Sequence, residues 1–331
     1  MTTLACPALL TLEQPDDLIG LCSAALSADD DVQLDARGLR FADPFGMALL
    51  GATCFTLQER GRVVQVSGLQ AAISGYLQRM DVFADVELVD CAPASGERRD
   101  RRDALVELTR IDNPAEIDLR ANQLADALVG RMPDIDLGEP LDDMTGMNTA
   151  YRLSIPLGYV LTELLNNALS HARRAGHKNA CVWVASQYYP KNHRLQLAVV
   201  DNGCGMLETL RNHSALADYK RKTDHLAILA ALRPRVSCNR DLGVFKDSVN
   251  QGVGLTTTAC IAQRAAGRLV VVSGAGFHDP LGRSGRLAPG VRWPGVAVAL
   301  ECRRDALKGV RFQDCLPSVE DAPQLHLRFE D

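Results

Sequence analysis

One stretch of the chain, residues 154–173, combines a broad apolar face with an unusual polar row. Its apolar residues recur every three or four positions, which predicts a helix that packs on a core. Pro156 suits the first turn of such a helix, with the serine two residues earlier as its expected cap. On the other side, Glu163, Asn167 and His171 stand four positions apart and line up along one face. Asparagine lowers helix propensity, so this row favours a functional reading over a merely solvated face.

Length and composition favour a globular chain with two domains. The 331 residues are 47% hydrophobic and 23% charged, and the net charge of −5 gives no general attraction to nucleic acid or to anionic membranes. Ten cysteines are scattered without a C-x-x-C pair, which favours buried thiols in a reducing cytosol over a zinc site or a disulfide framework. No basic leader and no long apolar run is found, so we expect a cytoplasmic protein without a membrane span.

The first ninety residues predict an α/β unit. Asp43 is a good helix cap, and Pro44 suits the first helical position after it. The expected strands lie near residues 9–12, 32–34 and 63–67, and the expected helices near residues 16–26, 44–59 and 69–80.

The order of these elements, with the passage VQLDARGLRFADPFGMALLGATCFTLQERGRVVQVSG, resembles the STAS domains of bacterial anti-sigma factor antagonists over residues 9–89. In regulatory members of that family a hydroxyl in the turn before the second helix accepts phosphate. Here the turn reads Asp43-Pro44-Phe45-Gly46 and carries no hydroxyl. The resemblance therefore implies a domain that docks or senses without being switched by phosphorylation at this turn; a generic α/β module is the alternative.

A polar, charged run at residues 91–103 is typical of a solvated linker. We therefore expect a STAS-like domain at residues 1–90, this linker, a second domain at residues 104–303 and a polar tail at residues 304–331. In the second domain the expected strands are residues 104–110, 180–186, 195–200, 269–273 and 296–302, and further helices are expected at residues 113–132 and 255–266.

Three short motifs of the second domain follow one another in a fixed order. The helix with Glu163 and Asn167 comes first, a strand that ends in D-N-G-C-G at residues 201–205 comes second, and G-V-G at residues 252–254 opens a helix about fifty residues later. This order resembles the nucleotide-binding boxes of the GHKL ATPases, most closely the anti-sigma factor serine kinases, over residues 104–302. The resemblance implies a Bergerat fold, an α+β two-layer sandwich that binds ATP with Mg²⁺.

The chemistry of these residues fits the roles that the resemblance implies. The amide oxygen of Asn167 suits Mg²⁺, with Asn166 in an assisting role, and Glu163 is the expected general base. Asp201 would accept a hydrogen bond from the adenine amine, while Gly203 and Gly205 would allow close backbone approach. The phosphates would lie at a helix N-terminus formed by Gly252, Val253, Gly254, Leu255 and Thr256.

Other positions leave alternatives open. His171 matches a third position of the family's first box, where it is either catalytic or a structural hydrogen-bonding residue. Thr256 or Thr257 either contacts the phosphates or serves in capping and packing. Residues 207–250 would form a lid over the nucleotide. The family's patterns have a glycine where this chain has Asn250, and a threonine where it has Val296 after Pro294-Gly295.

Three functions remain open at this point. The first is a cytoplasmic regulatory protein that uses binding and hydrolysis of Mg-ATP to control a protein partner, and a homodimer is one possible form. The second is a serine/threonine kinase that acts on a partner STAS protein, and the third is a nucleotide-gated interaction module without turnover. A histidine kinase is disfavoured because no histidine precedes His171 to accept phosphate.

Overall fold

The computed structural model describes residues 1–93, 105–130, 138–144, 146–234, 236 and 254–316. Within these residues the chain is a mixed α/β protein with a parallel sheet of four strands, an antiparallel sheet of seven strands and a short two-stranded pair. None of the helices in this part of the chain combines the length and apolar character that a membrane span needs. Most of the predicted linker lies outside the described residues. Residues 317–331 of the predicted tail also lie outside them.

The N-terminal unit contains the predicted strands and helices in the predicted order, together with three strands that were not predicted, Thr2–Ala5, Phe41–Ala42 and Glu87–Val89. Asp43 caps the second helix as expected, because its Oδ1 accepts a hydrogen bond of 2.8 Å from the backbone N–H of Gly46. The four-stranded sheet has the order β1 (Thr2–Ala5), β3 (Val32–Asp35), β5 (Val64–Ser67), β6 (Glu87–Val89); β2 (Leu9–Leu10) pairs with β4 (Phe41–Ala42), and the helices are α1 (Pro15–Leu26), α2 (Pro44–Glu59) and α3 (Ala71–Arg79).

The seven-stranded sheet carries the second half of the chain. Its order is β12 (Ser284–Arg286), β11 (Gly276–His278), β10 (Arg268–Gly274), β13 (Trp293–Arg303), β9 (Arg194–Asp201), β8 (Val182–Tyr189), β7 (Leu105–Ile111). The helices of this half are α4 (Ile117–Val129), α5 (Thr149–Ala172), α6 (Gly205–Leu210), α7 (Asp224–Ala231), α8 (Gly254–Arg264) and α9 (Arg304–Leu307). Helices α4, α5 and α8 pack on one face of the sheet.

Both faces of this sheet are buried. In β9, Leu197 and Val199 belong to the core beneath α4 and α5, while Ala198 and Val200 belong to a core shared with the N-terminal unit. Strands buried on both faces are apolar at nearly every position, which explains why this strand reads as a continuous apolar run in the sequence.

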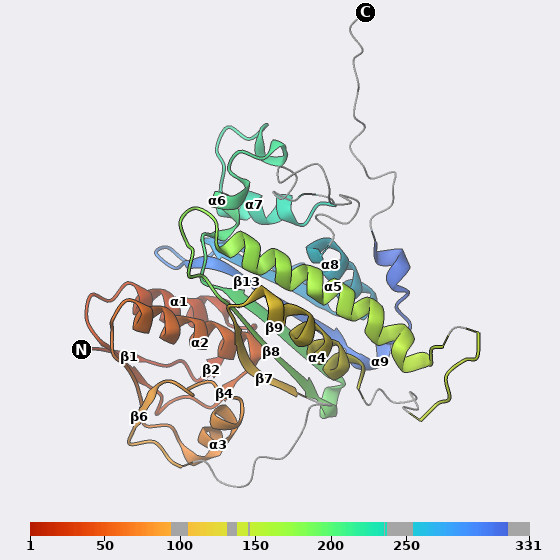
Figure 1. Ribbon diagram of the computed structural model, residues 1–331. Helices are drawn as coiled ribbons and strands as arrows, with labels where there is room; N and C mark the ends of the chain where they lie inside the picture. Colours follow the sequence, from red (N-terminus) through yellow and green to blue (C-terminus); the bar gives the residue numbers. More distant parts are fainter. Residues whose placement is uncertain (94–104, 131–137, 145, 235, 237–253, 317–331) are drawn as a thin grey trace, which may run out of the picture.

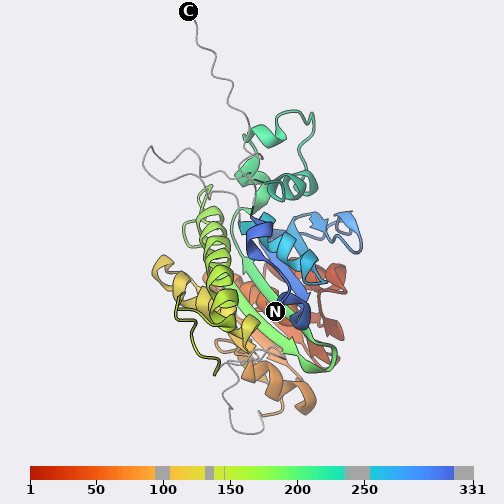
Figure 2. The ribbon, with the colours of Figure 1, turned by 90° about the vertical axis from the view of Figure 1, so that its right-hand side faces the viewer.

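Helices α1 and α2 lie between the two sheets. Helix α2 packs on β7, β8, β9 and β13 of the larger sheet and also contacts β5 of the smaller one. The two ribbon views accordingly place the N-terminal unit (red to orange) and the pair α4–α5 on opposite sides of the larger sheet (Figures 1 and 2). The N-terminal unit and the larger sheet therefore share one hydrophobic core.

The turn at residues 43–46 lies inside this interface. Asp43 is 2% exposed, and its Oδ2 accepts hydrogen bonds of 2.9 Å from Gln196 Nε2 of β9 and from the backbone N–H of Leu12. Burial raises the pKa of the Asp43 carboxyl, and these donors oppose that shift. Phe45 is fully buried beside it. The turn that resembles the STAS phosphorylation site is therefore buried between the N-terminal unit and the larger sheet.

The start of α5 differs from the prediction. The helix begins at Thr149 rather than near Pro156, and its cap is Asn148, whose Oδ1 accepts a hydrogen bond of 3.0 Å from Tyr151 N–H. The predicted cap, Ser154, and Pro156 both lie inside the helix. A proline inside a helix costs about 3 kcal/mol. Burial of Leu153 and Leu157 in the core offsets that cost.

Candidate functional site

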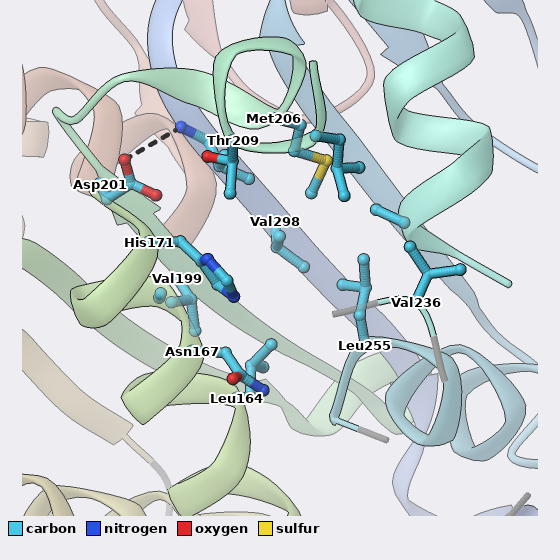
Figure 3. A pocket seen from close by; sticks show the side chains of 14 residues that line it. Leu164, Asn167, His171, Val199, Asp201, Met206, Thr209, Val236, Leu255 and Val298 are labelled. Carbon is cyan, nitrogen blue, oxygen red and sulfur yellow. Dashed lines mark hydrogen bonds between the residues drawn. The ribbon is translucent and has the colours of Figure 1, made fainter. Parts of the chain in front are cut away.

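A pocket lies between α5, the D-N-G-C-G loop, α7 and the start of α8 (Figure 3). It holds about 800 Å³ of empty space, its open mouth included. Its walls are mostly apolar, and polar groups lie along one side. The lining residues are Leu164, Asn167, Ala168, His171, Val199, Asp201, Met206, Thr209, Leu210, Ala231, Val236, Leu255, Val296 and Val298. An apolar pocket with a few convergent polar groups is the usual form of a small-molecule site.

Two members of the predicted polar row of α5, Asn167 and His171, line one side of the pocket, whereas the third, Glu163, is not part of its lining. Figure 3 shows Asp201, His171 and Asn167 in succession along this side, with Val199 and Val298 of the sheet behind them. Asn167 and His171 are one helical turn apart, so both side chains reach the same cavity. The pairing of Asn167 with Asp201, predicted from distant parts of the sequence, is thus found around one pocket.

Asp201 is the buried acid of the site. It is 3% exposed, and its Oδ1 accepts hydrogen bonds from the backbone N–H groups of Gly203 at 2.9 Å and Val296 at 3.2 Å. Its other carboxyl oxygen points towards the pocket (Figure 3). Burial raises the pKa of Asp201 to about 7, against the lowering effect of the two backbone donors. The carboxyl can therefore offer an acceptor to a ligand in an otherwise apolar cavity.

Close backbone packing holds this acid in place. A Cβ atom on Gly295 would lie 2.1 Å from the Asp201 carbonyl oxygen, and one on Gly203 would lie 2.3 Å from the Cα of Ala172 at the end of α5. Neither position has room for a side chain. The two glycines therefore let β13 and α5 approach the strand end that carries Asp201.

Gly205 and Ser273 fasten the rest of the loop. Gly205 has a φ of +74°, and a Cβ there would lie 2.8 Å from the carbonyl oxygen of Pro294. The Ser273 hydroxyl accepts a hydrogen bond of 2.8 Å from Met206 N–H and donates one of 3.0 Å to the Gly295 carbonyl. At both Gly203 and Gly205 the space that a Cβ atom would occupy is filled by protein backbone. Sequence reasoning did not identify Ser273, since a lone buried serine carries no motif.

His171 is neutral in the site. Burial lowers its pKa to about 4, and nearby Arg174 adds to the shift. Its Nδ1 is buried without a hydrogen-bond partner among the described residues, although the ring lies along the pocket wall (Figure 3). An unpaired buried nitrogen is costly, so a ligand that supplies a donor or acceptor there would remove the penalty.

The start of α8 approaches α5 beside Asn167. A Cβ on Gly254 would lie 3.2 Å from the backbone nitrogen of Leu164 and 3.4 Å from Asn167 Nδ2. Gly254 thus brings the free N–H groups of the first helical turn close to the polar row. Leu255 lines the pocket. The other two predicted residues of this motif, Gly252 and Val253, lie outside the described residues.

The remaining predicted residues are less central. Thr256 donates a weak hydrogen bond of 3.4 Å to the Leu232 carbonyl after α7, in keeping with the packing alternative. Asn166 is exposed and is not part of the pocket lining. Glu163 lies one turn before Asn167 and is half-buried, and this burial raises the pKa of its carboxyl.

The predicted lid is described in part. Most of α6 and all of α7 belong to this segment, and Ala231 and Val236 contribute to the pocket wall. Two of its basic residues contact the segment itself: Lys222 bonds to the Arg211 carbonyl, and Arg233 lies 3.1 Å from the Tyr219 hydroxyl. Three further basic residues of this segment, Arg235, Arg240 and Lys246, lie outside the described residues.

The side chains near Asn167 suit a metal ion that binds together with a polyphosphate, with few ligands from the protein. Across the described part of the chain, no group of three or more His, Cys, Asp and Glu residues could hold a metal ion by itself. Mg²⁺ usually keeps several waters and takes only one or two protein oxygens when it is bound with a polyphosphate. The Asn167 amide, half-buried beside the first turn of α8, fits that limited role.

Comparisons of the chain with models of protein families, with curated proteins and with solved structures found no match.

Proposed function

We propose that this chain is a cytoplasmic regulatory protein whose second half binds Mg-ATP in the pocket of Figure 3. The fold assignment that goes with this proposal is a Bergerat-type ATP-binding unit at residues 104–303, preceded by a STAS-like unit. The support is the arrangement of residues from three separate motifs, Asn167, Asp201 and Leu255, around one cavity, with Gly254 packed beside Asn167.

The observation that carries the proposal is the environment of Asp201. A carboxyl that is 3% exposed, held by two backbone donors through one oxygen, directs its second oxygen into an apolar pocket. The exocyclic amine of adenine is a donor that would pair with this oxygen, whereas the corresponding carbonyl of guanine would meet it with an acceptor. The apolar walls formed by Val199, Met206 and Val298 suit the faces of a flat base.

The phosphate end is assigned to the space between Asn167 and the start of α8. Free backbone N–H groups and the positive end of the helix dipole favour phosphate at such a position. Asn167 would hold the magnesium, which supplies positive charge to the phosphates when it is bound. Glu163, one turn earlier on α5, is the group assigned to receive a proton from water or from a substrate hydroxyl.

Hydrolysis, kinase activity and binding without turnover use the same pocket. Hydrolysis would place water next to Glu163, and kinase activity would place the hydroxyl of a protein partner there. The turn at residues 43–46 does not supply that hydroxyl, because it has none and is buried against β9. A kinase substrate would therefore be a separate protein, such as another STAS-type protein.

The N-terminal unit is assigned a regulatory role because of where it packs. Helix α2 covers the face of β8 and β9 opposite to the nucleotide side. Asn202, the residue after Asp201, donates a hydrogen bond of 2.9 Å to the Thr56 hydroxyl of α2. A change in the position of α2 would thus reach the loop that carries Asp201.

The test is calorimetric titration of the full-length protein with a non-hydrolysable ATP analogue in the presence of Mg²⁺. We expect binding of the adenine nucleotide and at least about tenfold weaker binding of the guanine analogue. Asn167→Ala should abolish the magnesium-dependent part of the affinity. Equal binding of both nucleotides, or no change in Asn167→Ala, would reject the site.

The function is then decided with radiolabelled ATP. Release of free phosphate identifies an ATPase, label on an added partner identifies a kinase, and binding without either identifies a nucleotide-gated module.

A further inference from the structure

Two cysteines that are far apart in the sequence meet at the C-terminal end of the described chain. Cys260 lies in the middle of α8, and Cys315 ends a short 3₁₀ turn, η6 (Phe312–Cys315), which packs on α8. Their sulfur atoms are 2.7 Å apart, and both are free thiols. This distance is shorter than an ordinary contact between two sulfur atoms that are not bonded.

We propose that Cys260 and Cys315 are a redox modification site and form an intramolecular disulfide when the protein meets a peroxide. The inference does not depend on nucleotide binding. The sequence offered no sign of it, because the two residues follow no spacing motif and are separated by a strand-rich segment.

The surroundings assign different roles to the two thiols. Cys260 is half-buried, whereas Cys315 is 5% exposed, so the oxidant reaches Cys260 first. Arg264 stands one turn after Cys260 on α8 and forms an ion pair of 3.1 Å with Asp314. Its guanidinium lies next to both thiols. Burial and the neighbouring Cys260 raise the pKa of the Cys315 thiol, and the positive charge of Arg264 opposes that rise.

The reaction proceeds in two balanced steps. The Cys260 thiolate attacks one oxygen of hydrogen peroxide, the O–O bond breaks, hydroxide leaves and the sulfur becomes a sulfenic acid. The Cys315 sulfur then attacks that sulfur, an S–S bond forms, the S–OH bond breaks, and water leaves with the Cys315 proton. Two thiols are oxidised to one disulfide, and one peroxide is reduced to two waters.

The product would tie η6 to α8. Helix α8 also supplies Gly254 and Leu255 at the pocket, so the bond would join the C-terminal segment to a helix of the candidate site. Disulfides in reducing compartments are mostly transient and redox-sensing, which agrees with the expected cytoplasmic setting. The cross-link closes a long loop and is therefore expected to raise the thermal midpoint of unfolding by roughly 5 °C.

The experiment treats the full-length reduced protein with hydrogen peroxide, blocks the remaining thiols and maps disulfides by mass spectrometry of non-reduced digests. We expect a cross-linked peptide pair that contains Cys260 and Cys315, with a mass loss of two hydrogens that dithiothreitol reverses. C260S and C315S should each lose this product. C91S, which removes another half-buried thiol, should keep it.

Several outcomes would overturn the proposal. The proposal is wrong if Cys260 of the folded wild-type protein stays reduced, if it is oxidised to sulfinic acid without cross-linking, or if it pairs with a cysteine other than Cys315. Circular dichroism of C260S and C315S checks that these variants fold. If one of them does not fold, the digest of the wild-type protein alone decides the question.

Discussion

Asn202 Nδ2 donates a hydrogen bond of 2.9 Å to the Thr56 hydroxyl, across the interface between the larger sheet and α2. The Asn202 side chain also accepts a bond of 2.9 Å from Cys181 N–H at the start of β8. Asn202, the residue directly after Asp201, is therefore hydrogen-bonded both to the larger sheet and to the N-terminal unit. This contact is a physical route by which the N-terminal unit can act on the candidate nucleotide site.

Replacing Thr56 tests that route. Thr56→Val removes the acceptor for Asn202 and keeps the shape of the side chain, so we expect ATP affinity to fall by roughly fivefold, equivalent to about 1 kcal/mol. Thr53→Val is the matched control, because the Thr53 hydroxyl donates to the Leu49 carbonyl of its own helix and does not contact the Asp201 loop among the described residues. Titration calorimetry measures both variants; equal losses would mean that α2 is merely destabilised.

Asp201→Asn addresses recognition of the base. The amide keeps one oxygen for the donors of Gly203 and Val296 but turns an N–H₂ group towards the pocket, where it would face the adenine amine. We expect ATP affinity to fall by roughly tenfold to a hundredfold. Affinity that is unchanged in this variant would show that the base does not contact Asp201.

The same substitution predicts a pH effect on stability. The folded-state pKa of Asp201 is about 7, well above that of an unfolded carboxyl, because burial disfavours its ionised form. The stability linked to this proton is full below the unfolded pKa and is lost as pH rises through about 7. Asp201→Asn should therefore be more stable than wild type at pH 8, by on the order of 2–4 kcal/mol, and close to it at pH 4. Urea unfolding at both pH values measures this; a gap that does not change with pH contradicts it.

Glu163→Gln separates binding from chemistry. If Glu163 is the general base, the amide should bind Mg-ATP within about twofold of wild type and lower turnover by at least roughly a hundredfold. Glu116→Gln, which neutralises an acid paired with Arg120 of α4 and away from the pocket, should leave turnover unchanged. Phosphate-release assays with both variants decide this, and normal turnover in Glu163→Gln would assign the proton transfer to another group.

Gln196→Leu probes the buried contact between the two units. The change removes the side-chain donor to Asp43 Oδ2, so we expect a loss of about 2 kcal/mol of unfolding free energy. Burial raises the pKa of Asp43, and the hydrogen bond from Gln196 opposes that shift. Because the variant lacks this bond, the pKa of Asp43 should rise further. The loss should then be larger at pH 8 than at pH 5, because the folded state must ionise Asp43 as pH rises. Gln65→Leu, on the smaller sheet, is the control and should show no such pH dependence.

The sequence by itself determined most local structure and the order of the motifs. The period of apolar residues predicted α5, the continuous runs predicted β8 and β9, and the Asp43-Pro44 pair predicted the start of α2. It also singled out Asn167 and Asp201, which the structure places around one pocket. These signals are local, since helix and strand periods and caps depend on residues a few positions apart.

Only the tertiary structure decided which distant groups meet. The cap of α5 is Asn148, so the helix begins seven residues before Pro156. The Asn148 amide also donates a hydrogen bond to the Glu139 carbonyl, which ties this cap to the preceding segment. Three further contacts join residues that share no local sequence pattern. Helix α2 packs on the larger sheet, Ser273 hydrogen-bonds to the loop after Asp201, and Cys260 contacts Cys315. Such contacts depend on long-range packing that buries apolar surface, and no spacing within the sequence encodes them.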